Sequence, residues 1–280
     1  MNRLEFSSQL LMTFCASVFL VVSTACGTKS PGSRETGDSP AKTTDPALEG
    51  ERIIEKYLSQ SRADQSLTMM RAKVHDSDGA TREVELTMRR KRAPDGAQWT
   101  LAEFTSPPEE RDRDALIKVS PKGDVEATRF MQSTKAFVTA KSASDEESLF
   151  GLTVQELADG QFEKYAFKLL AQEEGAPLFF VEGQLKAGQE SKFPRVVMAL
   201  SKENYMPLTA EFYDNHNALS RRIRIDNVSQ VQGHWTRMRW TVDNFARRKV
   251  TDFEVVEAKY DQNIPDSVFT EDYLKKIASK

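Results

Sequence analysis

The sequence predicts a mainly β protein of the α+β class, built on one large antiparallel sheet. Between residues 67 and 258 the chain divides into about a dozen short segments in which apolar and polar residues alternate, which is typical of strands. Turn residues such as Pro94-Asp95-Gly96 separate most of these segments. Helical spacing of apolar residues is confined to the two ends and one interruption, so the strands follow one another as an antiparallel meander. A sheet of so many strands must curl, split or close.

The first 25 residues have the layout of a secretory signal peptide. Arg3 gives a positive start, an apolar run from Leu10 to Val22 follows, and small residues precede Cys26. The apolar run is too short to cross roughly 30 Å of bilayer hydrocarbon comfortably. The motif VSTAC at residues 22–26 resembles the lipobox of bacterial lipoproteins. This resemblance implies that residues 1–25 are removed and that acyl groups on Cys26, palmitate among them, anchor the protein in a membrane.

Two further observations concern this predicted anchor. Cys15 is removed with the signal, so Cys26 becomes the only cysteine, and a lone thiol in an oxidising compartment is a liability unless it is used. Gly27 stands where Asp would mark retention in the inner membrane, so the resemblance implies the outer membrane, with the protein facing the periplasm. The alternative is a plain secreted protein in which Cys26 is incidental.

The rest of the chain divides into a tether and one folded domain. Residues 26–49 hold hardly any apolar side chains and predict a flexible tether, because such a segment cannot offset its conformational entropy by burial. Residues 50–280 are predicted to form one domain. It begins with a short amphipathic helix over residues 51–61, in which Ile53, Ile54 and Tyr57 form a buried stripe.

The strands and the remaining helices follow in order. The segments predicted as strands are 84–88, 99–104, 115–119, 125–131, 165–170, 178–185, 194–200, 208–213, 219–225, 234–242 and 250–258. Residues 142–160 interrupt them and predict a polar loop followed by a short helix. The chain closes with a helix over residues 270–277, in which Thr270 is the predicted cap and acidic residues precede lysines, as the helix dipole favours.

Two of the predicted strands, 178–185 and 194–200, are apolar on both faces, so both faces must be covered. Helices can cover one face, and the other then forms the inside of a curved sheet that holds an apolar ligand. The candidate ligand-binding residues are Phe180, Val196, Met198, Leu200, Trp235 and Trp240.

Four short stretches carry a resemblance to a known family. They are LFGLTVQEL at 149–157, ALSKENYMPL at 199–208, EFYDN at 211–215 and IPDSVFTEDYL at 264–274. They resemble the outer-membrane lipoprotein-sorting protein family, whose fold is of the LolA/LolB type. The resemblance implies an incomplete β-barrel of about 11–13 strands, with a few helices over a concave face that takes up acyl chains. It also implies a binding protein without enzymatic activity.

No sequence motif for catalysis, a metal or a cofactor was found. The three histidines, His75, His216 and His234, do not have metal-ligand spacing, and there is no Gly-x-Ser-x-Gly elbow, phosphate loop or His-Glu-x-x-His helix. We therefore expect no catalytic residue, no metal and no cofactor. The net charge of −3 gives no basic excess for nucleic acid.

Arginines gather on the last strands and allow two interpretations. Arg221, Arg237 and Arg239 are expected to share a face with Ile223 and Trp235. They either form a solvated face with cross-strand partners, or a basic rim that meets anionic headgroups or a partner protein.

The favoured function is that of a lipid- or lipoprotein-binding module with a role in outer-membrane lipoprotein sorting and without enzymatic activity. Its expected partners are membrane lipids or the acyl chains of lipoproteins. The first alternative is an accessory lipoprotein that docks to an envelope or export complex through the same sheet. A hydrolase acting on envelope lipids is a weaker third hypothesis, since it needs a nucleophile and a base within hydrogen-bond reach.

Overall fold

The computed structural model describes residues 45–61, 63–122, 124–141, 162–173 and 175–279. All of them belong to one compact unit. The predicted signal peptide, Cys26, most of the predicted tether, and the loop and helix predicted at 142–160 lie outside the described residues. These expectations therefore remain predictions.

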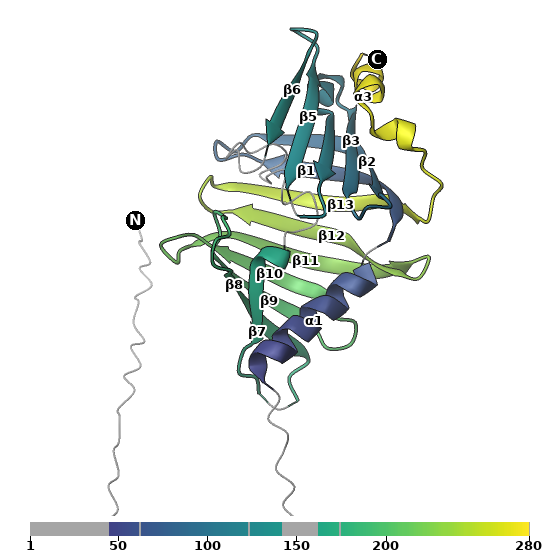
Figure 1. The fold of residues 1–280 in the computed structure, drawn as a ribbon. Helices are drawn as coiled ribbons and strands as arrows, with labels where there is room; N and C mark the ends of the chain where they lie inside the picture. Colours follow the sequence, from purple (N-terminus) through teal and green to yellow (C-terminus); the bar gives the residue numbers. More distant parts are fainter. Residues whose placement is uncertain (1–44, 62, 123, 142–161, 174, 280) are drawn as a thin grey trace, which may run out of the picture. The chain divides into compact units, whose positions relative to one another are not determined.

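The described residues form one sheet of 13 strands, in the order β6-β5-β4-β3-β2-β1-β13-β12-β11-β10-β9-β8-β7 (Figure 1). Neighbouring strands are antiparallel throughout, and β1 pairs with β13 to join the two halves. The strands are β1 (Gln65–His75), β2 (Thr81–Arg92), β3 (Gln98–Ser106), β4 (Ala115–Val119), β5 (Val125–Met131), β6 (Ala136–Lys141), β7 (Tyr165–Leu169), β8 (Leu178–Leu185), β9 (Arg195–Ser201), β10 (Pro207–Tyr213), β11 (Leu219–Val231), β12 (His234–Asn244) and β13 (Lys249–Tyr260). The end strands β6 and β7 do not pair with each other, so the sheet is open. The predicted fold class is confirmed.

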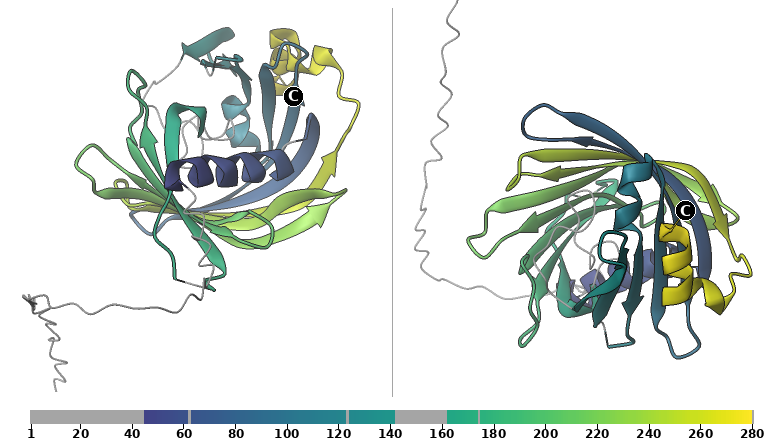
Figure 2. Two further views of the ribbon diagram at one scale, coloured as in Figure 1. Left: turned by 60° about the horizontal axis from the view of Figure 1, so that its bottom comes forward. Right: turned by 90° about the horizontal axis from the view of Figure 1, so that it is seen from above.

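The sheet is strongly curved, and β-bulges contribute to the curvature. The register shifts between Met69 and Met70 in the pairing of β1 with β13, and between Ile225 and Val228 in the pairing of β11 with β12. A bulge bends its strand and increases the local twist. The two halves of the sheet consequently turn toward each other around helix α1 (Pro46–Ser61), as Figure 2 shows.

Helix α1 begins at Pro46, earlier than residue 51, where the apolar stripe placed its start. The side chain of Asp45 explains the difference, because its Oδ1 accepts a hydrogen bond from the backbone N–H of Ala47 at 2.9 Å. Asp at the cap and Pro in the first turn both favour a helix start. The last residues of the segment predicted as a tether are therefore helical.

Two helices pack on opposite faces of the sheet. Helix α1 buries Ile53, Ile54 and Tyr57 against the concave face of β7–β10. Helix α3 (Glu271–Ala278), which follows the 3-10 turn η3 (Asp266–Phe269), instead packs with η3 on Leu101 and Leu116, on the convex face of β3–β5. The expectation that helices cover the concave face therefore holds for α1 and not for α3.

The predicted cap of α3 is confirmed, since the Thr270 side chain accepts a hydrogen bond from Tyr273 N at 3.3 Å. Among the described residues, no helix has the length and apolarity needed to cross a bilayer.

Candidate functional site

The concave face of β1–β5, β12 and β13 carries a large apolar surface, which we call the lining cluster. Every described member comes from a strand, at positions whose side chains alternate across the sheet and point to this face. Its buried members are Met70, Ala72, Val74, Val84, Leu86, Met88, Ala102, Phe104, Ala115, Ile117, Val125, Ala127, Val242, Phe253 and Val255. Trp240 packs at its margin and stacks on Phe253, with ring centroids 4.8 Å apart.

Small and flexible side chains occupy much of the lining cluster. Met88, Ala102 and Ala115 lie side by side in register on β2, β3 and β4, and all three are buried. Alanine leaves room that a larger side chain would fill, and methionine adapts its shape to what it contacts. This part of the concave face therefore suits a long, thin apolar group better than a rigid one.

A second apolar cluster, the helix cluster, lies where α1 covers β7–β10. Val196, Met198 and Leu200, three of the candidate ligand-binding residues, are 0–1% exposed and pack in this cluster with Ile53 and Tyr57 of α1. Helix α1 therefore already covers these three side chains. Ile223 packs against both clusters, so the apolar surface is continuous along the concave face.

The remaining candidate residues are distributed over both faces of the sheet. Trp235 packs at the margin of the helix cluster, and Trp240 packs on the lining cluster. Phe180 is 40% exposed, because it alternates with the fully buried Val181 and so lies on the convex face. The six candidates therefore do not line a single surface.

The three candidate arginines are also divided between the faces. Arg221 is 6% exposed on the concave face, with its guanidinium 5.1 Å from the ring centre of Phe193. Arg237 lies over the ring of Trp240 at 5.5 Å. Arg239 pairs in register with Glu254 and is exposed on the convex face. The expectation that all three share a face is wrong, because the bulge at Met238 changes the alternation of β12.

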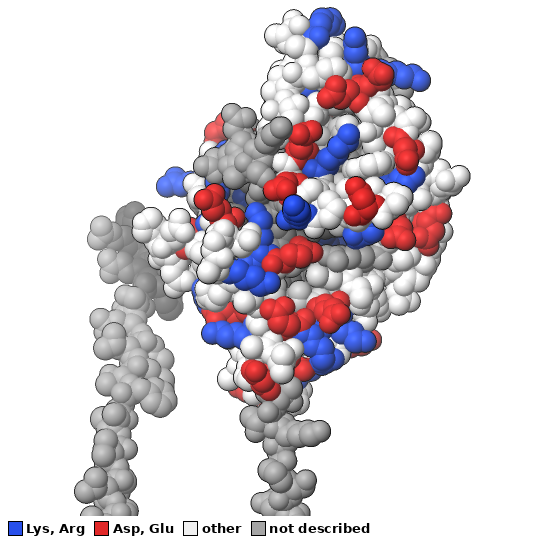
Figure 3. Space-filling model, in the orientation of Figure 1, with Lys and Arg blue, Asp and Glu red and all other residues white. Residues whose placement is uncertain are grey.

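Ion pairs between adjacent strands lie on the convex face. Arg195 binds Glu182 at 2.6 Å and Arg222 binds Glu211 at 2.9 Å, each on adjacent strands. On the face of the molecule in Figure 3, cations and anions are likewise interspersed. These pairs fit the solvated interpretation for Arg195 and Arg222, since each has a carboxylate partner on a neighbouring strand.

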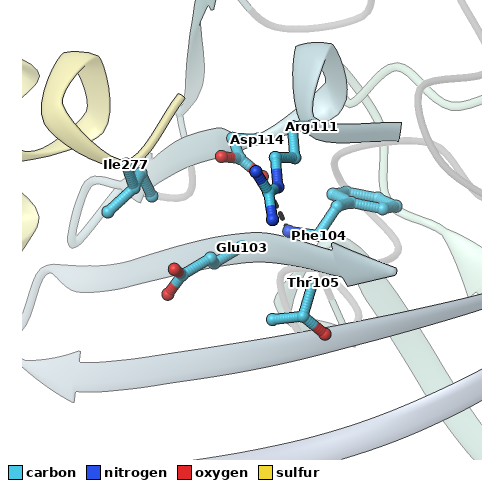
Figure 4. A pocket seen from close by; sticks show the side chains of 6 residues that line it. All are labelled: Glu103, Phe104, Thr105, Arg111, Asp114 and Ile277. Atoms are coloured by element: carbon cyan, nitrogen blue, oxygen red, sulfur yellow. Dashed lines mark hydrogen bonds between the residues drawn. The ribbon is translucent and has the colours of Figure 1, made fainter. Parts of the chain in front are cut away.

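Sequence reasoning missed a buried carboxyl group, Asp114. It adjoins a cavity of about 80 Å³, and the side chains around this cavity are shown in Figure 4. Its Oδ1 accepts a hydrogen bond from Phe104 N at 2.6 Å, and the residue is 1% exposed. Burial raises the pKa of Asp114 to about 7, with a smaller contribution from Glu103, although the bond from Phe104 lowers it. Asp114 ends a highly charged run, so the sequence gives no sign that it is buried.

A hydroxyl, an imidazole and a carboxylate on the convex face lie in succession within hydrogen-bond distance. Thr81 Oγ1 is 3.3 Å from His75 Nδ1, and His75 Nε2 is 3.1 Å from Asp252 Oδ2. These groups are exposed, and the cavity beside Asp114 has none of them in its lining. They fit a surface network better than a catalytic site, which needs a bound substrate. No group of three potential metal ligands occurs among the described residues.

Solved structures with this arrangement of strands define the fold as LolA-like. A LolA superfamily protein from Nitrosomonas europaea is 20% identical, with a TM-score of 0.64 over 80% of this chain and 99% of the other. A Vibrio parahaemolyticus domain described as an outer membrane lipoprotein-sorting protein is 19% identical, with a TM-score of 0.73 over 82% and 99%. A DUF1329 family protein from Desulfovibrio piger is 18% identical, with a TM-score of 0.76 over 82% and 100%.

The chain belongs to the DUF1329-like family of uncharacterized proteins, whose model matches residues 96–276. None of the curated proteins matches the sequence. At these identities the solved structures establish the fold, and the predicted LolA-like fold is confirmed.

Proposed function

We propose that this protein binds acyl chains of lipids or lipoproteins on the concave face of its sheet, without enzymatic activity. The lining cluster is the observation that carries the proposal, since seven strands present a continuous apolar surface with small side chains at its centre. The LolA-like fold of the solved relatives, one of which is described as lipoprotein-sorting, supports a role in the cell envelope.

The physical driving force is burial of methylene groups, which is worth about 0.8 kcal/mol for each one removed from water. The members of the lining cluster are already buried, so an acyl chain must replace contacts that they now make. Methionine side chains lower the cost of such an exchange, because they are flexible and can repack. The neighbouring alanines contribute by their small size.

We further propose that the protein is a lipoprotein, anchored in the outer membrane through acylated Cys26 and facing the periplasm. The VSTAC motif at residues 22–26 and the polar residues after it support this arrangement. In this proposal residues 1–25 are the signal peptide and the folded domain follows a short tether.

A bulky residue on the lining should block uptake. Ala258 is partly buried and packs against the lining cluster, so Ala258→Trp would fill space for three or four methylenes. We expect a loss of about 3 kcal/mol, or roughly a hundredfold in affinity, for a fluorescent fatty acid. The measurement is a titration of the full chain carrying Cys26→Ser, so that no anchor of its own competes.

The matched control is Ala80→Trp, in the exposed turn between β1 and β2. Circular dichroism checks that both variants fold. If neither the parent nor the control takes up the fatty acid, or if Ala258→Trp binds it equally well, the proposal is wrong.

One observation favours docking to a protein partner as a second candidate function. Among the described strands, β6 has a neighbour on one side only, and its Phe137 and Val138 are 36% and 48% exposed. An exposed apolar edge can accept a strand from another chain. Docking is favoured if this protein binds no lipid and Val138→Lys abolishes its complexes with other proteins.

A further inference from the structure

Residues 245–249 comprise the turn between β12 and β13 and the first residue of β13, and they differ from the other described turns in combining an exposed aromatic ring with consecutive cations. Their sequence is Phe-Ala-Arg-Arg-Lys. The Phe245 side chain is 44% exposed, and Ala246, Arg247 and Arg248 are exposed as well. We call this segment the cationic turn.

The cationic turn is held in a defined conformation. Asn244 is 6% exposed, and its Oδ1 accepts a hydrogen bond from Arg247 N at 3.2 Å. Phe245 N donates to the carbonyl of Ser220 at 3.0 Å, which ties the turn to β11. Arg248 completes the turn with a φ of 52°. Hydrogen bonds therefore fix the backbone that carries the exposed ring and the arginines.

Three nearby carboxylates already have partners other than the arginines of the turn, and one of these partners is Lys249 of the turn itself. Asp76 binds Lys249 at 2.9 Å, and Asp243 binds Arg224 at 3.5 Å. Asp214, in the adjacent turn between β10 and β11, accepts hydrogen bonds from two backbone N–H groups. No ion pair joins Arg248 to any other described residue. The exposed Arg248 therefore presents positive charge outward, in the same turn as an exposed aromatic ring.

We propose that the cationic turn docks the protein on the surface of a bilayer that contains anionic phospholipids. The arginines meet the phosphate groups, and Phe245 enters the interface between headgroups and acyl chains. A cation near such a surface gains about fivefold in affinity, and an exposed aromatic ring adds an apolar contribution. The guanidinium of Arg222 lies 5.6 Å from the ring centre of Phe245, so a further cation accompanies the ring.

A lipid surface explains the turn better than a protein partner does. A stable protein interface needs roughly 800 Å² from each partner, which a turn of five residues cannot supply. A membrane requires only a few charges and one apolar side chain, because its surface is laterally continuous. The proposal does not depend on acyl-chain binding, so the two can fail separately.

The test uses site-specific fluorescence on the full chain. Both native cysteines are replaced by serine, Phe245→Cys carries a bimane label, and vesicles contain phosphatidylethanolamine and phosphatidylglycerol. We expect the label to shift to shorter wavelengths and to be quenched by doxyl lipids, and we expect high salt to reverse both effects. The control label is at Val256→Cys, which is 56% exposed on β13 and should not respond. The N-terminal apolar segment is the same in both proteins.

A second pair of variants tests the charges. With the label at position 245, Arg247→Glu with Arg248→Glu should weaken vesicle binding at least tenfold. Lys73→Glu with Lys118→Glu changes the net charge equally, on exposed positions of β1 and β4, and should not weaken it. The proposal is overturned if the two labels respond alike, if phosphatidylcholine vesicles give the same response, or if the two charge reversals have equal effects. Fatty-acid uptake should be unchanged in all these variants.

Discussion

Replacing Asp114 by asparagine should stabilise the protein at pH 8 by about 2–4 kcal/mol. The pKa of Asp114 is raised to about 7 by burial, whereas an aspartate in an unfolded chain has a pKa of about 3.9. The folded protein therefore favours the neutral carboxyl, and this contribution to stability is lost as the pH rises through 7. Asparagine is neutral at every pH and keeps an oxygen that can accept the hydrogen bond from Phe104 N.

The measurement is denaturant unfolding of both proteins between pH 4 and pH 9. The advantage of Asp114→Asn should be small near pH 4, grow up to pH 7 and then level off. Asp112→Asn, at an exposed position of the neighbouring 3-10 turn η1 (Pro108–Arg113), is the matched control and should change little. Parallel pH profiles for the parent and Asp114→Asn would mean that this carboxyl is ionised in the folded protein at neutral pH.

Gly50→Ala should destabilise the protein by about 2–3 kcal/mol, although alanine is the better helix former by about 1 kcal/mol. Gly50 lies where α1 crosses β7, and an added Cβ would be 2.5 Å from the Cα of Lys168. The clash involves backbone, so α1 must move away from the strand. That movement would also lengthen the hydrogen bond from Phe167 N to Glu51 Oε1, now 2.8 Å.

Thermal unfolding and binding of a hydrophobic dye measure the effect. We expect the melting temperature to fall by roughly 4–12 °C and the dye to bind as the helix cluster becomes exposed. Glu55→Ala, on the exposed side of the same helix, is the control and should have little effect. An increase in stability with Gly50→Ala would show that α1 does not pack closely on β7.

Local sequence patterns were enough to predict the class of the fold and several of its details. The alternation of Val84, Leu86 and Met88 with polar residues identified β2, and the structure buries these three side chains on the concave face. The turn at Pro94-Asp95-Gly96 forms as predicted, with Ala97 N bonded to Asp95 Oδ1 at 3.0 Å. Such features depend only on residues that are close in the sequence, so a single sequence is enough to predict them.

Features that depend on tertiary packing were not predictable in the same way. Phe180 and Val181 are both apolar, so only the packing of α1 decides which of them faces inward. The position of Arg239 depends on the bulge at Met238, which no local signal marks. Strand β6 was missed because it is a short edge strand with exposed side chains, and Asp114 was missed because its neighbours in sequence are charged and exposed.

The central claim is that the concave lining of the sheet is the surface that contacts acyl chains. Photo-cross-linking with a fatty acid that carries a diazirine near its methyl end tests this claim most directly. The full chain with Cys26→Ser is irradiated with the probe, digested and analysed by mass spectrometry. We predict adducts on peptides that contain Met70 and Met88, which competing palmitate removes. Adducts confined to exposed residues such as Phe137 and Phe180, or no adducts that palmitate displaces, would contradict the claim.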